Sequence, residues 1–142
     1  MRLSISLFPV LVALAASGRV FADLPLATGQ YEIEVRISLP NVQDVATPLL
    51  FSKCIAQADL ESGQAFFILS DNPLKVCDLL DYEVTGDRAA YRVACAGPNR
   101  GSAVAAFDTK ATTYRGTIKM NMGGKNMTMS ETQVARKTGE CP

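Results

Sequence analysis

Four of the five methionines lie in the stretch KMNMGGKNMTM, at positions 119–129. Met120 and Met122 precede a Gly-Gly pair, and Met127 and Met129 follow it. Thioether sulfurs are soft ligands that select Cu(I) or Ag(I). Methionine also forms adaptable apolar surfaces for a ligand and fills gaps in protein cores. The stretch therefore has three interpretations: a metal site, an apolar ligand-binding face, and core packing.

A hairpin around the Gly-Gly pair places all four methionines on one face of a sheet. A two-residue turn pairs Met120 with Met127, whereas a four-residue loop pairs Met120 with Met129. Side chains alternate between the two faces along a strand, so the four share a face in either case. Core packing is the favoured interpretation and an apolar ligand face is second. A metal site is third, because the chain has no His or Trp to complete a copper site. The opposite face is polar, and we expect it in solvent: Lys119, Asn121, Thr128 and Ser130.

Few residues are suited to catalysis. Without histidine, the chain can form neither a Ser-His nor a Cys-His pair. Its carboxylates group as Glu32 with Glu34, and as Asp78 with Asp81 and Glu83, which is typical of solvated strand faces. We therefore expect no enzyme activity, no catalytic residue and no cofactor.

The first 22 residues have the pattern of a secretory signal peptide. Arg2 precedes the apolar run 7–16, which is shorter than the roughly 20 residues needed to cross a bilayer. Val20-Phe21-Ala22 then supplies small or aliphatic residues before a cleavage site. The pattern predicts cleavage after Ala22 and export, and no later segment is apolar enough to span a membrane.

The remaining residues, 23–142, have the length of a single domain. They carry 12 basic and 14 acidic side chains with no basic stripe, which argues against a nucleic-acid partner. All four cysteines lie in this part: Cys54, Cys77, Cys95 and Cys141. An even number of cysteines after an export signal predicts two disulfides. A zinc site is disfavoured because no C-x2-C spacing occurs.

Apolar and polar residues alternate along most of the chain, which is typical of half-buried strands. The pattern predicts a mainly β fold: a curved antiparallel sheet or partial barrel of about seven strands with one short helix. The predicted helix covers 56–61 and ends near Gly63, and an apolar plug covers 66–69. The predicted strands cover 31–39, 49–54, 80–84, 89–93, 102–107, 113–122 and 127–136.

A hairpin is predicted around Gly86 and Asp87, with glycine first in a type II′ turn. The register that this turn imposes pairs Tyr82 with Tyr91, Leu80 with Val93 and Asp81 with Arg92. The same register places Cys95 opposite Asp78, so that a bond from Cys95 to Cys77 requires a bulge in the strand.

Strand direction predicts which cysteines are bonded. In a meander, the start of the third strand and the end of the fourth lie at one end of the sheet, which favours Cys77–Cys95. If residues 55–76 cross back over the sheet, the end of the second strand lies with the end of the seventh, which favours Cys54–Cys141.

The order of these segments resembles a known family. The segments are TGQYEIEV, FSKCIAQADLE, KVCDLLDYEVTGDRAAYRVACAG, FDTKATTYRGTIKMNM and NMTMSETQVARKTGEC. Together they resemble the small exported proteobacterial proteins of domain-of-unknown-function family 3617. The resemblance implies a periplasmic location, a β-rich fold and two disulfides, and it brings no activity or catalytic residue. This chain has Ile55-Ala56-Gln57 where the family often has Thr or Ser as a helix cap.

Three functions are compatible with the sequence. The favoured one is a non-catalytic binding module for an apolar or amphipathic ligand, lined by the four methionines with Tyr82, Tyr91, Phe66 and Phe67. The alternative is an envelope protein that binds a periplasmic protein or inhibits a periplasmic enzyme through the loops 40–47 or 97–101. The third, with the least support, is a Cu(I) or Ag(I) binder that uses the four methionines.

Overall fold

The structure is a computed structural model that describes residues 23–42, 47–97, 100–123 and 127–142. The predicted signal peptide lies outside the described residues, as do parts of the loops 40–47 and 97–101. Within the described part, no helix has the length and apolar character needed to cross a membrane.

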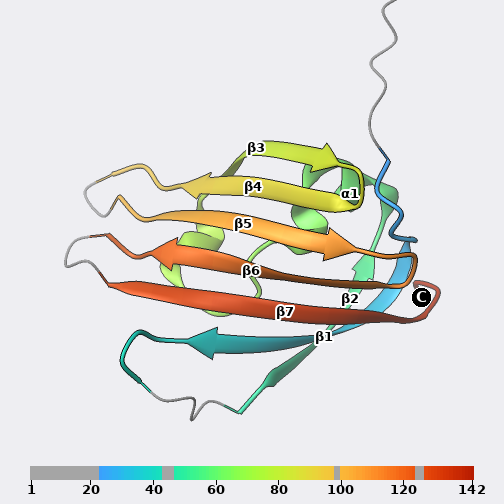
Figure 1. The fold of residues 1–142 in the computed structure, drawn as a ribbon, viewed down its shortest axis with the longest axis horizontal. Helices are drawn as coiled ribbons and strands as arrows, with labels where there is room; N and C mark the ends of the chain where they lie inside the picture. Colours follow the sequence, from blue (N-terminus) through green and yellow to red (C-terminus); the bar gives the residue numbers. More distant parts are fainter. Residues whose placement is uncertain (1–22, 43–46, 98–99, 124–126) are drawn as a thin grey trace, which may run out of the picture.

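Seven antiparallel strands form one open sheet, as the sequence predicts (Figure 1). The spatial order is β2-β1-β7-β6-β5-β4-β3, so β2 and β3 are the two edges. In chain order the strands are β1 (Gly29–Ser38), β2 (Leu49–Ile55), β3 (Asp78–Thr85), β4 (Arg88–Ala94), β5 (Ser102–Thr109), β6 (Thr113–Asn121) and β7 (Thr128–Gly139).

The first and last strands of the domain lie side by side. From β3 to β7 each strand pairs with the next along the chain, but β1 inserts between β2 and β7. Ile33 lies opposite Ala135, and Val35 lies opposite Gln133. This long-range pairing makes one continuous sheet from a hairpin and a five-stranded meander.

Alternation along each strand separates an inner face from an outer face. On β1, Tyr31, Ile33 and Val35 are fully buried on the inner face, whereas Glu32 and Glu34 point outward. We call outer the face that carries Glu32 and Glu34. The pattern follows from burying one face of an antiparallel sheet while the other meets water.

Residues 56–76, which we call the covering segment, pack on the inner face behind the sheet in Figure 1. They contain α1 (Gln57–Ser62) and the 3-10 turns η1 (Gln64–Phe66) and η2 (Pro73–Val76). The helix prediction is confirmed within one residue. Ala56 provides no side-chain cap, and Asp59 supplies the reciprocal bond of a capping box, because its Oδ2 accepts the Ala56 N–H at 2.8 Å. Gly63 ends the helix with a φ of 82°, a conformation that favours glycine.

Aromatic rings fill the space between the covering segment and the sheet. The Phe66 ring lies 5.1 Å from those of Phe107 and Tyr114, measured between centroids. Tyr91 stacks on Phe107 at 6.3 Å and donates its hydroxyl to the Phe66 carbonyl at 2.8 Å. The predicted apolar plug is therefore the centre of the core.

The β3–β4 hairpin confirms the predicted turn and corrects the predicted register. Next to the turn, Val84 lies opposite Ala89, as predicted. Beyond a bulge at Asp81, whose φ is 51°, the register shifts by one residue. Leu79 therefore faces Val93 and Leu80 faces Arg92, so the predicted Leu80–Val93 and Asp81–Arg92 strand pairs are wrong. The Asp81 and Arg92 side chains still form an ion pair. The bulge is the irregularity that a bond between Cys77 and Cys95 requires.

Both disulfides join the predicted partners, Cys54 with Cys141 and Cys77 with Cys95. Cys54 lies opposite Gln30 on β1, and Gln30 lies opposite Gly139 on β7. The first disulfide therefore ties the edge strand β2 to the C-terminus across β1, and the second closes the start of the β3–β4 hairpin.

Candidate functional site

Of the two predicted registers, the methionine strands pair in the one that corresponds to a four-residue loop. Met120 lies opposite Met129, and the Met122 N–H donates to the Met127 carbonyl at 2.8 Å. The four methionine side chains differ in how much of each is exposed to solvent. Met120 is 2% exposed, Met122 and Met129 are half-buried against the core, and Met127 is 63% exposed. Met120 therefore packs as core, and Met127 projects from the end of the sheet.

The other candidates on the inner face are packed to different degrees. Phe66 and Tyr91 are buried, and Phe67 and Tyr82 are half-buried beside them. The Tyr82 hydroxyl donates to the Leu60 carbonyl of α1 at 2.7 Å. Where these side chains meet, the inner face is occupied by the protein's own covering segment.

Burial keeps the tyrosine hydroxyls of the inner face protonated. It raises the pKa of Tyr82 to about 12. It also raises the pKa of Tyr91 and of Tyr114, with a further contribution from the Glu131 carboxylate nearby. The Tyr82 and Tyr91 hydroxyls donate to carbonyls of the covering segment and tie it to the sheet, whereas the Tyr114 hydroxyl donates to Gln133 Oε1 on β7 at 3.2 Å.

A buried carboxylate that the sequence analysis missed holds the same segment. Glu131 is fully buried on β7, and its Oε1 accepts the Leu69 N–H at 3.0 Å and the Gln133 amide at 2.7 Å. Its Oε2 accepts the Ser70 N–H at 3.0 Å and the Ser70 hydroxyl. Glu131 and Gln133 alternate with Met129 along the strand, so the sequence indicates that all three share one face. That alternation is the signal by which Glu131 could have been recognised as an inward-facing residue.

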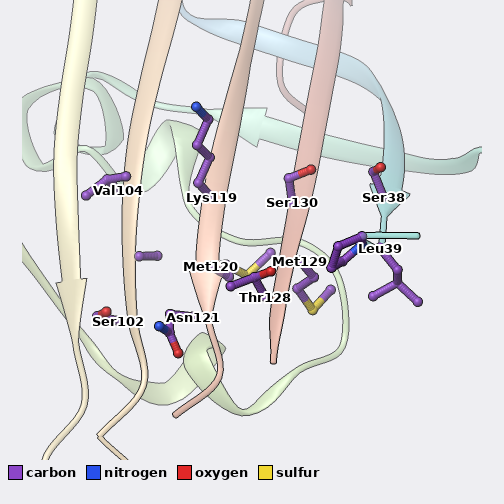
Figure 2. A pocket seen from close by; sticks show the side chains of 12 residues that line it. Ser38, Leu39, Ser102, Val104, Lys119, Met120, Asn121, Thr128, Met129 and Ser130 are labelled. Carbon is purple, nitrogen blue, oxygen red and sulfur yellow. The ribbon is translucent and has the colours of Figure 1, made fainter. Parts of the chain in front are cut away.

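A hollow of about 510 Å³ opens at the end of the sheet where β1 and β6 end and β5 and β7 begin (Figure 2). Its lining includes the apolar residues Leu39, Pro40 and Val104, and it also reaches Met120 and Met129, whose side chains belong to the inner face. Leu39 is 45% exposed and Val104 is 53% exposed. In Figure 2, Met129 lies near Leu39 at the start of β7. The hollow thus presents apolar surface that the fold leaves open to solvent.

Polar side chains surround this apolar surface. Most come from outward-facing positions of the strands, and Lys119 is the one charged residue among the described residues of the lining. The other polar members are Ser38, Ser102, Asn121, Thr128 and Ser130. Apolar surface within a ring of hydroxyl and amide groups is suited to an amphipathic molecule.

A second hollow of about 500 Å³, which we call the trough, adjoins the first and shares Val104 and Lys119 with it. Its floor is a row of short side chains across three strands: Ala106 lies opposite Thr117, which lies opposite Thr132. The Thr117 and Thr132 hydroxyl oxygens are 3.4 Å apart. Longer side chains, including Lys119 and Arg115, stand in the rows on either side.

The sequence predicts that Lys119, Asn121, Thr128 and Ser130 lie in solvent and that a ligand would bind on the methionine face. The structure places them in the lining of the hollow, on the outer face. Alternation identifies which face a residue occupies, but it gives no signal for where that face is hollowed.

The carboxylates grouped by sequence lie in exposed ion pairs. Glu32 pairs with Arg136 at 2.8 Å and Glu34 with Arg36 at 2.7 Å. The Asp81 carboxylate accepts the Arg92 Nε at 2.7 Å. These contacts agree with solvated strand faces.

Comparison with known proteins identifies a family and gives no function. No curated protein and no solved structure matches the chain. The model of a family described as "Protein of unknown function (DUF3617)" matches residues 26–141, a range that includes all seven strands and all four cysteines. The chain therefore belongs to the DUF3617 family of proteins of unknown function.

Proposed function

We propose that this protein is a non-catalytic binding module of the bacterial periplasm and that its ligand is amphipathic. The observation that carries the proposal is the hollow at the end of β6 and the start of β7, in which open apolar surface lies within a polar ring. Its volume of about 510 Å³ lies within the range of small-molecule sites, roughly 300–1,000 Å³. The two disulfides are compatible with an oxidising compartment such as the periplasm.

Burial of apolar surface would supply much of the affinity. Covering the exposed parts of Val104 and Leu39 removes apolar area from water, which is worth about 25 cal/mol per Å². Serine, threonine and asparagine side chains at the rim would orient the polar part of the ligand.

The other two functions have less support from the geometry. The four-methionine metal site has little, because Met120 is buried in the core whereas Met127 points into solvent. The alternative of a periplasmic protein partner is favoured by Leu39 and Val42, which are 45% and 52% exposed at the start of the loop after β1. A partner bound at this loop would touch the same end of the sheet.

Native mass spectrometry of protein purified from the periplasm is the first test. We expect an adduct with the mass of an amphipathic molecule on a chain that has lost residues 1–22 and holds two disulfides. A copper adduct that disappears when all four methionines are replaced by leucine would instead support the metal site. A protein that stays in the cytoplasm with its first 22 residues attached would contradict export.

A titration tests whether the hollow is the binding site. Dodecyl maltoside below its critical micelle concentration should shift the amide signals of Val104, Lys119 and Ser130. Val104→Ser should weaken these shifts, because it removes exposed apolar surface inside the hollow. Val134→Ser is the matched control, since Val134 is a 44% exposed valine on the outer face of β7 that lines neither the hollow nor the trough. Equal loss in both variants would exclude the hollow.

A further inference from the structure

The trough beside the hollow has an excess of positive charge. Four charged residues line it, three of them basic: Arg88, Arg115, Lys119 and Asp108. The Asp108 carboxylate lies 3.9 Å from Arg88 Nε, which offsets that guanidinium. Within the described residues, neither Arg115 nor Lys119 forms an ion pair. The local charge is therefore complementary to an anion.

Strand geometry places these two cations on either side of the threonine floor. Arg115, Thr117 and Lys119 alternate along β6 and point to the same outer face. The two charged residues are four positions apart, so their Cα atoms are separated by roughly 13 Å. Long side chains from both ends can therefore approach a group bound above Thr117.

The floor between the cations provides hydrogen-bonding groups and room. Thr117 and Thr132 are half-buried, and their hydroxyls lie side by side at 3.4 Å. Each hydroxyl can donate to an anionic oxygen. Ala106 continues the floor with a methyl group only, so nothing larger than a threonine occupies this row on β5, β6 and β7.

Lys119 and Val104 join the trough to the hollow. Both line both depressions, and they lie opposite each other on β5 and β6. A single ligand with its apolar part against Val104 and Leu39 would therefore have its head group within reach of Lys119 and Thr117.

We propose that the ligand of this protein is an anionic amphipath, whose phosphate, sulfate or carboxylate group is held in the trough between Arg115 and Lys119. The assignment rests on the proposed binding function and adds the charge of the ligand. The anion meets Arg115 and Lys119 from opposite sides and the hydroxyls of Thr117 and Thr132 from below. Because the trough is open to solvent, salt screens the attraction.

The test compares three probes on the protein with both disulfides formed: dodecyl phosphate, dodecyl maltoside and inorganic phosphate. The two detergents have the same chain length and are used below their critical micelle concentrations. Amide signals of Thr117 and Thr132 report the trough, and those of Val104 and Ser130 report the hollow. We expect dodecyl phosphate to bind most tightly and to shift both sets, with an affinity that falls as salt rises.

Charge-removing variants locate the anion. Lys119→Gln and Arg115→Gln should each weaken dodecyl phosphate binding about two- to fivefold, the range for an exposed ion pair. Arg115→Gln, at a residue that does not line the hollow, should not change dodecyl maltoside binding by a comparable factor. Arg136→Gln is the matched control, since it removes one positive charge from the outer face outside the trough and the hollow.

The outcomes separate the two proposals. Equal affinity for dodecyl phosphate and dodecyl maltoside would overturn the anionic assignment and leave the amphipath-binding function intact. An equal loss of dodecyl phosphate affinity in Arg136→Gln and Lys119→Gln would also overturn the anionic assignment. Inorganic phosphate that binds as tightly as dodecyl phosphate would overturn the amphipath function, because the apolar chain would then contribute nothing. Absence of binding by all three probes would overturn both.

Discussion

At the scale of single residues, Glu131 is the polar group on which the core depends most. It accepts four hydrogen bonds, three of which come from Leu69 and Ser70 of the covering segment. No basic side chain pairs with it in the described part of the chain. A buried acceptor of this kind replaces hydrogen bonds that Leu69 and Ser70 would otherwise make to water.

Glu131→Gln should destabilise the fold by about 2 kcal/mol or more. At one of the two carboxylate oxygen positions, the NH2 group of glutamine would face hydrogen-bond donors. Its N–H would then be buried without an acceptor. Urea unfolding followed by circular dichroism measures the free energy of unfolding. Glu32→Gln is the control, because the exposed Glu32–Arg136 pair contributes less than about 1 kcal/mol. Equal losses in the two variants would contradict the role assigned to Glu131.

Gly116 is required because an aromatic ring covers it. A Cβ at this position would lie 2.3 Å from Phe107 Cδ1 and 2.4 Å from the Ala106 carbonyl oxygen. Gly116→Ala should therefore reduce the free energy of unfolding by about 1–3 kcal/mol, the range for an overpacked core. Gly139→Ala is the control, since nothing lies within 4 Å of its added Cβ. An unchanged denaturation midpoint for Gly116→Ala would show that the ring moves aside without cost.

At the scale of elements, Tyr82 joins the edge strand β3 to α1. Its hydroxyl donates to the Leu60 carbonyl, and its ring lies against Gly63, where an added Cβ would be 2.7 Å from Tyr82 Cδ2. The bulge at Asp81 is next to this contact and turns the strand toward the helix. One aromatic side chain thus positions the start of the covering segment.

The same contact predicts a loss of stability at alkaline pH. Burial raises the pKa of Tyr82 to about 12 in the folded protein, against about 10 in the unfolded chain. Below pH 10 the phenol is protonated in both states and its contribution is complete. As pH rises from 10 to 12 the unfolded chain loses the proton first, so the free energy of unfolding falls.

Urea unfolding at pH 8, 10 and 11 measures this effect. Tyr82→Phe lacks the titrating group, so its stability should fall less steeply between pH 10 and pH 11 than that of the unmodified protein. Titration of Tyr91 and Tyr114 lowers the stability of both proteins equally, so it does not affect the comparison. Parallel pH profiles would exclude Tyr82 as a source of the loss.

At the scale of the whole molecule, the two disulfides secure an open sheet of modest size. Cys54–Cys141 closes a loop of 87 residues and Cys77–Cys95 one of 18. Loop-closure entropy gives about 4.5 kcal/mol for the first and about 3 kcal/mol for the second. The longer loop is stabilised more because its closure removes more freedom from the unfolded chain.

Paired serine variants measure the two contributions separately. Replacing Cys54 and Cys141 together should lower the free energy of unfolding more than replacing Cys77 and Cys95 together. The measurement is urea unfolding of each double variant against the parent. The reverse order would indicate that local packing around the hairpin, rather than loop length, determines the stabilisation.

Local patterns predicted much of this architecture. Alternation located the seven strands, and the turn at Gly86 fixed the hairpin register as far as the bulge. The requirement that Cys77 reach Cys95 predicted that bulge, but it did not say that the bulge would lie at Asp81. Position and extent of a bulge depend on what the side chains on each face must contact, here Tyr82 against α1.

The sequence by itself determined the strands, the helix, the disulfide partners and the common face of the four methionines. The strands, the helix and the methionine face depend on side-chain alternation, which is a local property. The disulfide partners depend on strand direction and on the assumption that residues 55–76 cross back over the sheet. Only the tertiary structure decided that β1 lies against β7, and that the covering segment fills the inner face. It also decided that the open hollow lies among residues such as Lys119 and Ser130, on the outer face. A depression depends on the relative sizes of side chains that neighbouring strands bring together, and a single strand does not contain that information.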